Sequence, residues 1–189
     1  MKLKGNKIYL KTGLKHSDYK KLLKYFTDIE VMRYICFAKK TVNFNKVGEV
    51  IDFWKGRKDV KLFGIYTRKG KFIGYTDIIG GKKSREFGII IGDKKYWGKG
   101  IGFEATKLIL DYCFNKLKLN KVTLTTSEFN KRAIKLYKKL GFKTTKTIPK
   151  GRVVFYNNKW LLSGTIAMET KKEKIIKSNK APFQNSNKT

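Results

Sequence analysis

Apolar and polar positions alternate, or recur every three to four residues, along most of the chain. Alternation predicts strands at residues 7–11, 61–66, 72–79, 86–91, 121–126, 142–147, 152–156 and 160–168. A three-to-four spacing predicts helices at residues 17–26, 29–35, 47–54, 101–117 and 131–140. Ser17 is expected to cap the first helix, and Gly141 to end the last one. The Asn157-Asn158 pair predicts a tight turn between the final two strands, because Asn tolerates a positive φ.

The order of these elements predicts an α/β (α+β) fold. Short turns join the strands between residues 61 and 91, which favours an antiparallel meander. The later strand–helix–strand crossover requires one parallel pair. We therefore expect a mixed, mostly antiparallel sheet of about seven strands with about four flanking helices. Residues 1–170 are predicted to form a single domain, and residues 171–189, which lack a core pattern, a disordered basic tail.

A glycine-bearing loop, Gly98-Lys99-Gly100-Ile101-Gly102, separates a predicted strand from the longest predicted helix. Glycines let a ligand approach the backbone, and a helix N-terminus presents free N–H groups, so this loop suits a pyrophosphate. A tight turn with close helix packing would need the same glycines. The spacing excludes a Walker loop, which requires Gly-Lys-Ser/Thr. It also excludes a dinucleotide fingerprint, because no acid lies about 20 residues further on, near Asn120.

The stretch from Glu86 to Phe142 resembles the coenzyme-A-binding half of GNAT acetyltransferases. That family's pattern is Arg/Gln-x-x-Gly-x-Gly/Ala, followed by Asn, a helix with Tyr, and Leu-Gly-Phe. The matching positions here are Gly100, Gly102, Asn130, Tyr137 and Leu140-Gly141-Phe142, whereas Trp97 departs from Arg/Gln. The resemblance is to the branch of ribosomal-protein N-terminal (alanine/serine) acetyltransferases and spermidine acetyltransferases. With DIEVMRYI and VVFYNNKWLLSGTIAMET included, it covers nearly all of residues 6–170.

This resemblance implies acetyl-CoA as co-substrate and gives individual residues their roles. Tyr137 would be the general acid that protonates the leaving thiol, although its place on the apolar stripe of its helix equally fits a core residue. Asn130 would bond the pantetheine arm or cap the next helix. The expected cofactor-binding positions, which act largely through backbone amides, are Ile89, Ile90, Ile91, Trp97, Gly98, Lys99, Gly100, Ile101, Gly102 and Asn130.

The general base is left open by the sequence. Glu86 begins the strand that leads to the expected acetyl site, and it matches an acidic position of the branch. Asp77 and Glu128 are alternatives, and so is a base that acts through a relayed water.

The formal net charge of +31 permits two interpretations. It would attract nucleic acid or the ribosome, but the excess is spread along the chain and only six of the basic residues are Arg, which indicates compositional bias. Cys36 and Cys113 form no metal-ligand cluster and are expected to be reduced, buried thiols, and His16 is expected on the surface. We expect no metal, no signal peptide and no membrane partner, and a cytoplasmic monomer or homodimer.

The acceptor is expected to be a primary amine. An α-amine is substantially neutral at pH 7 whereas a lysine amine is not, so a site without a strong base favours a protein N-terminus. The positive charge disfavours spermidine unless Asp28, Glu30 and Asp52 gather at the substrate mouth. The alternatives are a small-molecule acceptor (polyamine, antibiotic or amino sugar) and, in another class, a non-catalytic RNA- or ribosome-binding module.

Overall fold

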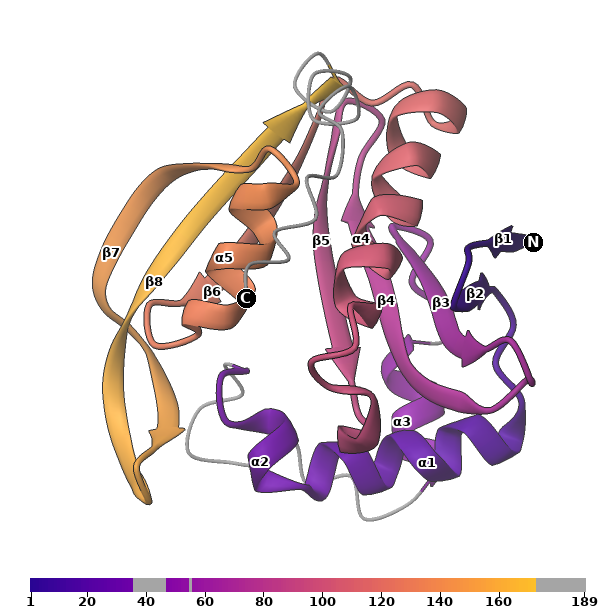
Figure 1. Cartoon of the computed structure of the whole chain (residues 1–189), viewed down its shortest axis with the longest axis horizontal. Helices are drawn as coiled ribbons and strands as arrows, with labels where there is room; N and C mark the ends of the chain where they lie inside the picture. Colours follow the sequence, from indigo (N-terminus) through magenta and orange to yellow (C-terminus); the bar gives the residue numbers. More distant parts are fainter. Residues whose placement is uncertain (36–46, 55, 173–189) are drawn as a thin grey trace, which may run out of the picture.

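Eight strands form one sheet in the computed structural model of the chain, which describes residues 1–35, 47–54 and 56–172. In spatial order they are β1 (Lys2–Lys4), β2 (Ile8–Lys11), β3 (Val60–Thr67), β4 (Phe72–Gly80), β5 (Ser84–Ile91), β6 (Lys121–Ser127), β8 (Lys159–Lys171) and β7 (Lys143–Tyr156). The α-helices are α1 (His16–Thr27), α2 (Ile29–Met32), α3 (Val47–Trp54), α4 (Ile101–Asp111) and α5 (Lys131–Lys139). Figure 1 shows how they surround the sheet.

The topology confirms the predicted mixed, mostly antiparallel sheet. Neighbouring strands are antiparallel at every junction except β5–β6, which the α4 crossover makes parallel. Asn157 and Asn158 adopt φ values of 49° and 58° in the turn between β7 and β8, as predicted.

Four local predictions differ from the structure. Ser17 does not cap α1; the helix begins at His16, and the Asp18 carboxylate accepts a hydrogen bond from the Lys15 N–H at 2.9 Å. The predicted strands 142–147 and 152–156 are one strand, β7, whose pairing with β8 shifts register between Ile148 and Arg152. The predicted helix 101–117 ends as α4 at Asp111 and continues as a wider π-helical turn to Lys116. β1 was not predicted, because three residues are too few for an alternation to be recognised.

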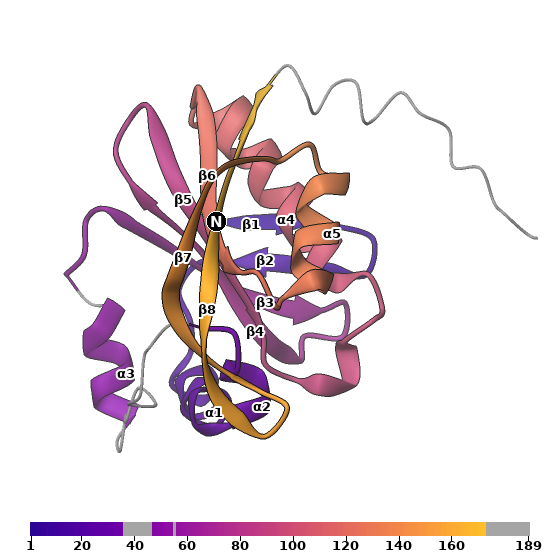
Figure 2. The ribbon, with the colours of Figure 1, turned by 90° about the vertical axis from the view of Figure 1, so that its left-hand side faces the viewer.

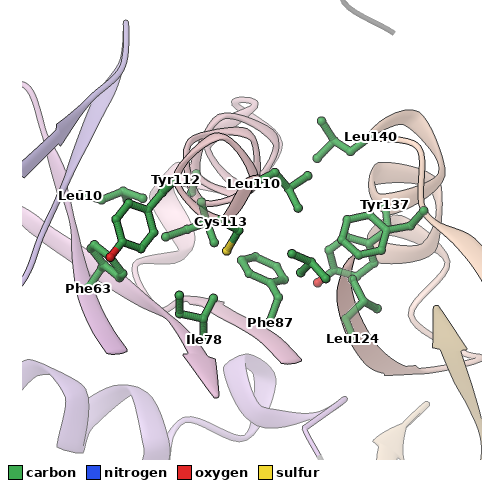
Figure 3. Packing of buried hydrophobic residues seen from close by; sticks show 14 of the residues in the cluster. Leu10, Phe63, Ile78, Phe87, Leu110, Tyr112, Cys113, Leu124, Tyr137 and Leu140 are labelled. Atoms are coloured by element: carbon green, nitrogen blue, oxygen red, sulfur yellow. The ribbon is translucent and has the colours of Figure 1, made fainter. Parts of the chain in front are cut away.

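Two apolar clusters lie between the sheet and its helices. Figure 2 shows α4 and α5 on one side of the sheet. The larger cluster lies between the sheet and the helices α4 and α5, and Figure 3 shows its packing around Phe87, Cys113 and Tyr137. The smaller cluster joins α1 and α2 to the opposite face, with Phe26 and Tyr75 packed edge to face. Cys113 is buried, as predicted; Cys36 and residues 173–189 lie outside the described residues.

The sheet opens between its two parallel strands. β5 and β6 pair only from Ser84 to Glu86 on one strand and from Lys121 to Thr123 on the other. Beyond this point β5 stays paired with β4 as far as Ile91, whereas β6 stays paired with β8. The two halves of the sheet therefore diverge, and no strand of the described part of the chain pairs with the free edge of the second half of β5.

Candidate active site

A cleft of about 400 Å³ lies where β5 and β6 diverge. It draws its lining from the end of β5, the start of α4, one face of α5 and the loop before it, the end of α2 and the turn after it, and the end of β7. The lining residues are Glu30, Val31, Arg33, Tyr34, Ile35, Ile89, Ile90, Ile91, Trp97, Gly102, Phe129, Asn130, Lys131, Arg132, Ala133, Leu136, Tyr137 and Tyr156. Segments that are distant in sequence thus meet at the break in the sheet.

The free edge of β5 presents main-chain groups to this break. The carbonyl of Gly88 accepts a hydrogen bond from Thr76 Oγ1 on β4 at 2.7 Å, and the N–H of Gly92 donates to the carbonyl of Ile73 at 2.9 Å. Main-chain direction alternates along a strand, so the N–H and C=O groups of Ile89 and Ile91 point toward the break. One of these groups, the Ile91 carbonyl, accepts from Trp97 Nε1 at 2.7 Å. The main-chain N–H of Ile89 is therefore a donor, and its C=O an acceptor, for an extended ligand that carries amides.

The glycine loop opens α4 in a left-handed conformation. Gly98 and Gly100 have φ values of 74° and 78°, which residues with a Cβ rarely adopt. The helical bonds of α4 start with Glu104 N donating to the Gly100 carbonyl at 3.1 Å, so the N–H groups of the first turn have no helical acceptor. Together with the positive end of the helix dipole, these groups make the loop an anion-binding element.

Tyr137 is both a core residue and a cleft residue. Its ring is 8% exposed and meets Phe87 edge to face, with centroids 6.3 Å apart. Burial raises the pKa of its hydroxyl to about 12, so the phenol keeps its proton across the physiological range. No described residue hydrogen-bonds to this hydroxyl, and Tyr137 is among the residues that line the cleft.

Asn130 caps α5 through its side chain. Its Oδ1 accepts a hydrogen bond from the Ala133 N–H at 3.2 Å, as the sequence allowed. Because the residue also lines the cleft, capping and ligand contact are compatible in it.

None of the three candidate bases lines the cleft. Glu86 is exposed, and its Oε1 accepts a hydrogen bond from Thr125 Oγ1 at 3.2 Å. Glu128 Oε1 accepts from the Gly164 N–H at 2.6 Å. Asp77 is buried against Gly88; desolvation raises the pKa of its carboxyl to about 7, and the negative charge of Glu86 acts in the same direction. Among the described residues, Glu30 supplies the only carboxylate of the cleft wall.

Two of the three acids considered for a substrate mouth lie together. Asp28 Oδ2 and Glu30 Oε2 both contact Lys94 Nζ, at 2.8 and 2.9 Å, and Glu30 lines the cleft. Asp52 is exposed on α3, and no contact links it to this pair. Lys94 therefore offsets part of the negative charge at this edge.

The predicted cofactor positions divide into two groups. Ile89, Ile90, Ile91, Trp97, Gly102 and Asn130 line the cleft together with Tyr137. Gly98, Lys99, Gly100 and Ile101 form the loop beside it, and Lys99 and Ile101 border a separate basic hollow with Lys7 and Arg68. The sequence did not single out Arg33, Tyr34, Phe129, Arg132 and Tyr156, because nothing local signals that α2, the β6–α5 loop and β7 converge.

The part of the chain that the structure describes contains neither a metal-binding cluster nor a membrane-spanning helix. No group of three or more His, Cys, Asp or Glu residues there could hold a metal ion. No helix in residues 1–35, 47–54 or 56–172 is long and apolar enough to cross a membrane.

A family model described as an acetyltransferase (GNAT) domain matches residues 11–143 of the chain. The chain belongs to the GNAT acetyltransferase family. This assigns the open sheet, the glycine loop and the adjoining cleft to one family architecture. GNAT acetyltransferases use acetyl-CoA, and the features described above fit such a ligand: an anion-binding loop, a strand edge for amides, and a half-apolar cleft between them.

Curated relatives place the strongest sequence similarity in a short stretch. The spermidine N(1)-acetyltransferase of Escherichia coli K12 is 47% identical over 57 residues, which is 30% of this chain and 30% of that protein. The uncharacterized protein YkkB of Bacillus subtilis is 29% identical over 134 residues, 66% of this chain and 75% of that protein. The first match therefore spans less than a third of the relative's length.

Solved structures resemble the whole fold. The spermidine N-acetyltransferase of Vibrio cholerae, in complex with CoA and spermine, gives a TM-score of 0.76 at 20% identity and covers 91% of this chain and 99% of that one. A GNAT-family acetyltransferase from Bacillus anthracis gives 0.73 at 20% identity, covering 92% and 99%. At this identity the likeness establishes the fold.

Proposed function

We propose that this GNAT protein transfers the acetyl group of acetyl-CoA to a primary amine of a small molecule, with a polyamine as the first acceptor to test. The observation that carries the proposal is the meeting of three features at one cleft: the helix-opening glycine loop beside it, and the free edge of β5 and Tyr137 in its wall.

Each of these features has a part in the reaction. The first-turn N–H groups of α4 hold the pyrophosphate, and the main-chain groups of Ile89 bond the amides of the pantetheine arm. The amine nitrogen forms a bond to the acetyl carbon as the carbon–sulfur bond breaks. Tyr137 gives its proton to the departing sulfur, and the amine loses a proton to a base or to water. A phenol whose pKa is raised to about 12 is still protonated near pH 7, so the proton is present when the carbon–sulfur bond breaks.

The relatives favour a small-molecule acceptor over the protein N-terminus that the sequence argument favoured. A curated relative that is 47% identical over 57 residues and a structural neighbour with a TM-score of 0.76 are both named as spermidine acetyltransferases. Glu30 lines the cleft and shares Lys94 with Asp28, so two acids lie where a cationic acceptor would be attracted.

A protein N-terminus is the second candidate, and one observation favours it. Glu30 is the one carboxylate of the cleft wall among the described residues, and it is already paired with Lys94. A site with so little basic capacity suits an amine that is partly neutral at pH 7, and an α-amine meets this condition.

An acceptor panel separates the candidates. The protein is incubated with acetyl-CoA and, separately, with spermidine, an aminoglycoside, a peptide with a free N-terminal alanine, and the same peptide with its N-terminus blocked. Thiol release and product mass are followed, with the Tyr137→Phe variant as control. Acetylated spermidine supports the proposal, and acetylation of the free peptide alone supports the second candidate. Absence of transfer to every amine, with RNA retained above about 0.3 M salt, would indicate a nucleic-acid-binding module instead.

A further inference from the structure

A second hollow, of about 630 Å³, lies at the other end of β5 from the cleft. It forms where the starts of β5 and β6 meet the end of β8 and the turn before β6, and Figure 1 shows the start of β5 and the end of β8 at the top of the molecule. Its lining residues are Lys83, Ser84, Phe114, Lys118, Leu119, Asn120, Lys121, Lys171 and Lys172. We call it the lysine hollow, because five of these lining residues are lysines and none of them is acidic.

Main-chain hydrogen bonds fix the shape of the lysine hollow. The Asn120 N–H donates to the Lys83 carbonyl at 3.1 Å, which joins the β4–β5 turn to the start of β6. The Leu119 N–H donates to the Cys113 carbonyl at 3.0 Å and closes the turn in which Lys118 has a φ of 55°. The segments that carry the lysines are therefore held together by the fold, and the concave shape does not depend on a ligand.

The positive charge of the lysine hollow is largely uncompensated. Lys121 Nζ lies 3.3 Å from Glu169 Oε2. In the described part of the chain, no carboxylate forms an ion pair with the other four lysines. Charges of one sign around a concave surface reinforce one another's potential, so the hollow attracts an anion more strongly than the same lysines spread over a convex face would. The net charge is spread along the sequence, but the fold concentrates part of it here.

The side chains of the hollow also indicate which kind of anion fits. Lysine presents a point charge, without the planar fork with which Arg selects a single carboxylate or phosphate. Phe114 and Leu119 are buried beneath the lysines, so the described lining offers no open aromatic face on which a base could stack. Several phosphates in a row match this arrangement, whereas recognition of bases does not.

We propose that the lysine hollow binds the phosphate backbone of a nucleic-acid strand without regard to base sequence. The hollow and the cleft share no lining residue among those described. Ser84 in the hollow and Ile90 in the cleft are separated by a length of strand of roughly 20 Å. A strand bound at the hollow would leave the cleft open, so this inference does not depend on the proposed function.

Matched variants of the full chain test the proposal. The hollow variant combines Lys83→Gln, Lys118→Gln and Lys172→Gln, all at exposed positions that line the hollow. A second variant carries Lys→Arg at the same three positions and keeps the charge. Thermal unfolding shows whether each variant is folded, and fluorescence anisotropy measures binding of a labelled single-stranded RNA of about 16 nucleotides at salt concentrations from about 0.05 to 0.3 M.

A control variant removes the same amount of charge from another surface. It combines Lys11→Gln, Lys20→Gln and Lys24→Gln, at exposed positions of β2 and α1 that do not line the hollow. The control separates a site at the hollow from the general attraction that a net charge of +31 exerts on any polyanion.

We expect the hollow variant to bind the RNA about tenfold or more weakly than wild type at about 0.15 M salt. On a single strand each phosphate contact contributes about 0.7 to the slope of log K against log salt, so loss of three contacts should lower that slope by about 2. The control variant should lose less than about threefold in affinity, and the Lys→Arg variant should bind like wild type.

Three results would overturn the proposal. The first is an equal loss of affinity in the hollow and control variants, which would show that the attraction is diffuse. The second is a wild-type protein that does not bind the RNA at about 0.15 M salt. The third is binding of inorganic tripolyphosphate that requires the hollow lysines while RNA binding does not, which would assign the hollow to a small polyphosphate.

Discussion

Tyr137 belongs both to the apolar core and to the lining of the cleft. The sequence allowed a core residue or a functional one, because the apolar stripe of α5 and the family motif share the position. The structure shows that Tyr137 is in the core and also borders the cleft, since the break beside β5 brings solvent-accessible space to the edge of the core. Its role as proton donor stays a prediction. The general base was harder to predict from the sequence. Whether a carboxylate faces a ligand depends on the direction of its strand and on its neighbours in the fold. The carboxylates of Glu86, Asp77 and Glu128 all contact other parts of the protein.

Replacing Tyr137 by Phe tests the proton-donor role at this scale. The ring keeps its packing against Phe87, so thermal stability should be nearly unchanged, whereas kcat should fall about 100-fold or more. Burial raises the pKa of Tyr137 to about 12, so its ionisation should not reduce wild-type kcat up to about pH 10. Steady-state rates from pH 6 to pH 10 measure both effects. An alkaline loss of activity that vanishes in Tyr137→Phe would contradict this assignment.

The raised pKa of the Asp77 carboxyl predicts that the free energy of unfolding depends on pH. Desolvation raises the pKa of its carboxyl to about 7, with Glu86 adding to the shift and Arg57 opposing it. Because the pKa of Asp77 is higher in the folded protein than in the unfolded chain, the folded protein releases this proton at a higher pH than the unfolded chain does. The contribution of this group to stability is therefore complete below about pH 4 and is lost as pH rises to about 7.

The Asp77→Asn variant should not show this loss of stability between about pH 4 and pH 7. Relative to wild type, its free energy of unfolding should rise between pH 4 and pH 7 by up to roughly 4 kcal/mol. Urea denaturation at several pH values checks the difference. A wild-type-minus-variant difference that stays constant with pH would show that Asp77 ionises normally in the folded protein.

At the level of elements, the N-terminal hairpin supports the glycine loop. Lys7 Nζ donates to the Lys99 carbonyl at 3.0 Å, and the Lys7 N–H donates to Glu104 Oε1 at 2.9 Å, so one residue links the β1–β2 turn to both sides of the α4 N-terminus. The sequence predicted the loop, α3, α5 and most strands, because their periodicity is local. It did not predict β1, the union of two runs in β7, or the contact between hairpin and loop, which arise from tertiary pairing.

The Lys7→Met variant tests this support. Loss of the side-chain bond to the Lys99 carbonyl should loosen the loop and raise the KM for acetyl-CoA about threefold to tenfold, with kcat within about twofold of wild type. Lys11→Met, at the end of β2 in the same hairpin, removes one positive charge and serves as the control. Equal KM values in the two variants would mean that Lys7 acts only through its charge.

On the scale of the whole molecule, the cleft exists because the sheet divides. Its walls come from α2, β5, the start of α4, α5 and β7, and no single stretch of sequence contains it. The family pattern therefore located the residues proposed to bind the donor, whereas Arg33, Tyr34, Phe129 and Tyr156 emerged only from the fold. The net charge of +31 surrounds this cleft with a positive field that attracts any polyanion, so binding of acetyl-CoA is informative only where that field is screened.

The central claim is that the divided sheet forms a specific acetyl-CoA site. Calorimetric titration at about 0.3 M salt, with acetyl-CoA in one series and ATP in another, tests it most directly. We expect saturable one-to-one binding of acetyl-CoA and little heat from ATP. Equal weak binding of the two ligands would contradict it, because the glycine loop would then be only a turn on a strongly basic protein.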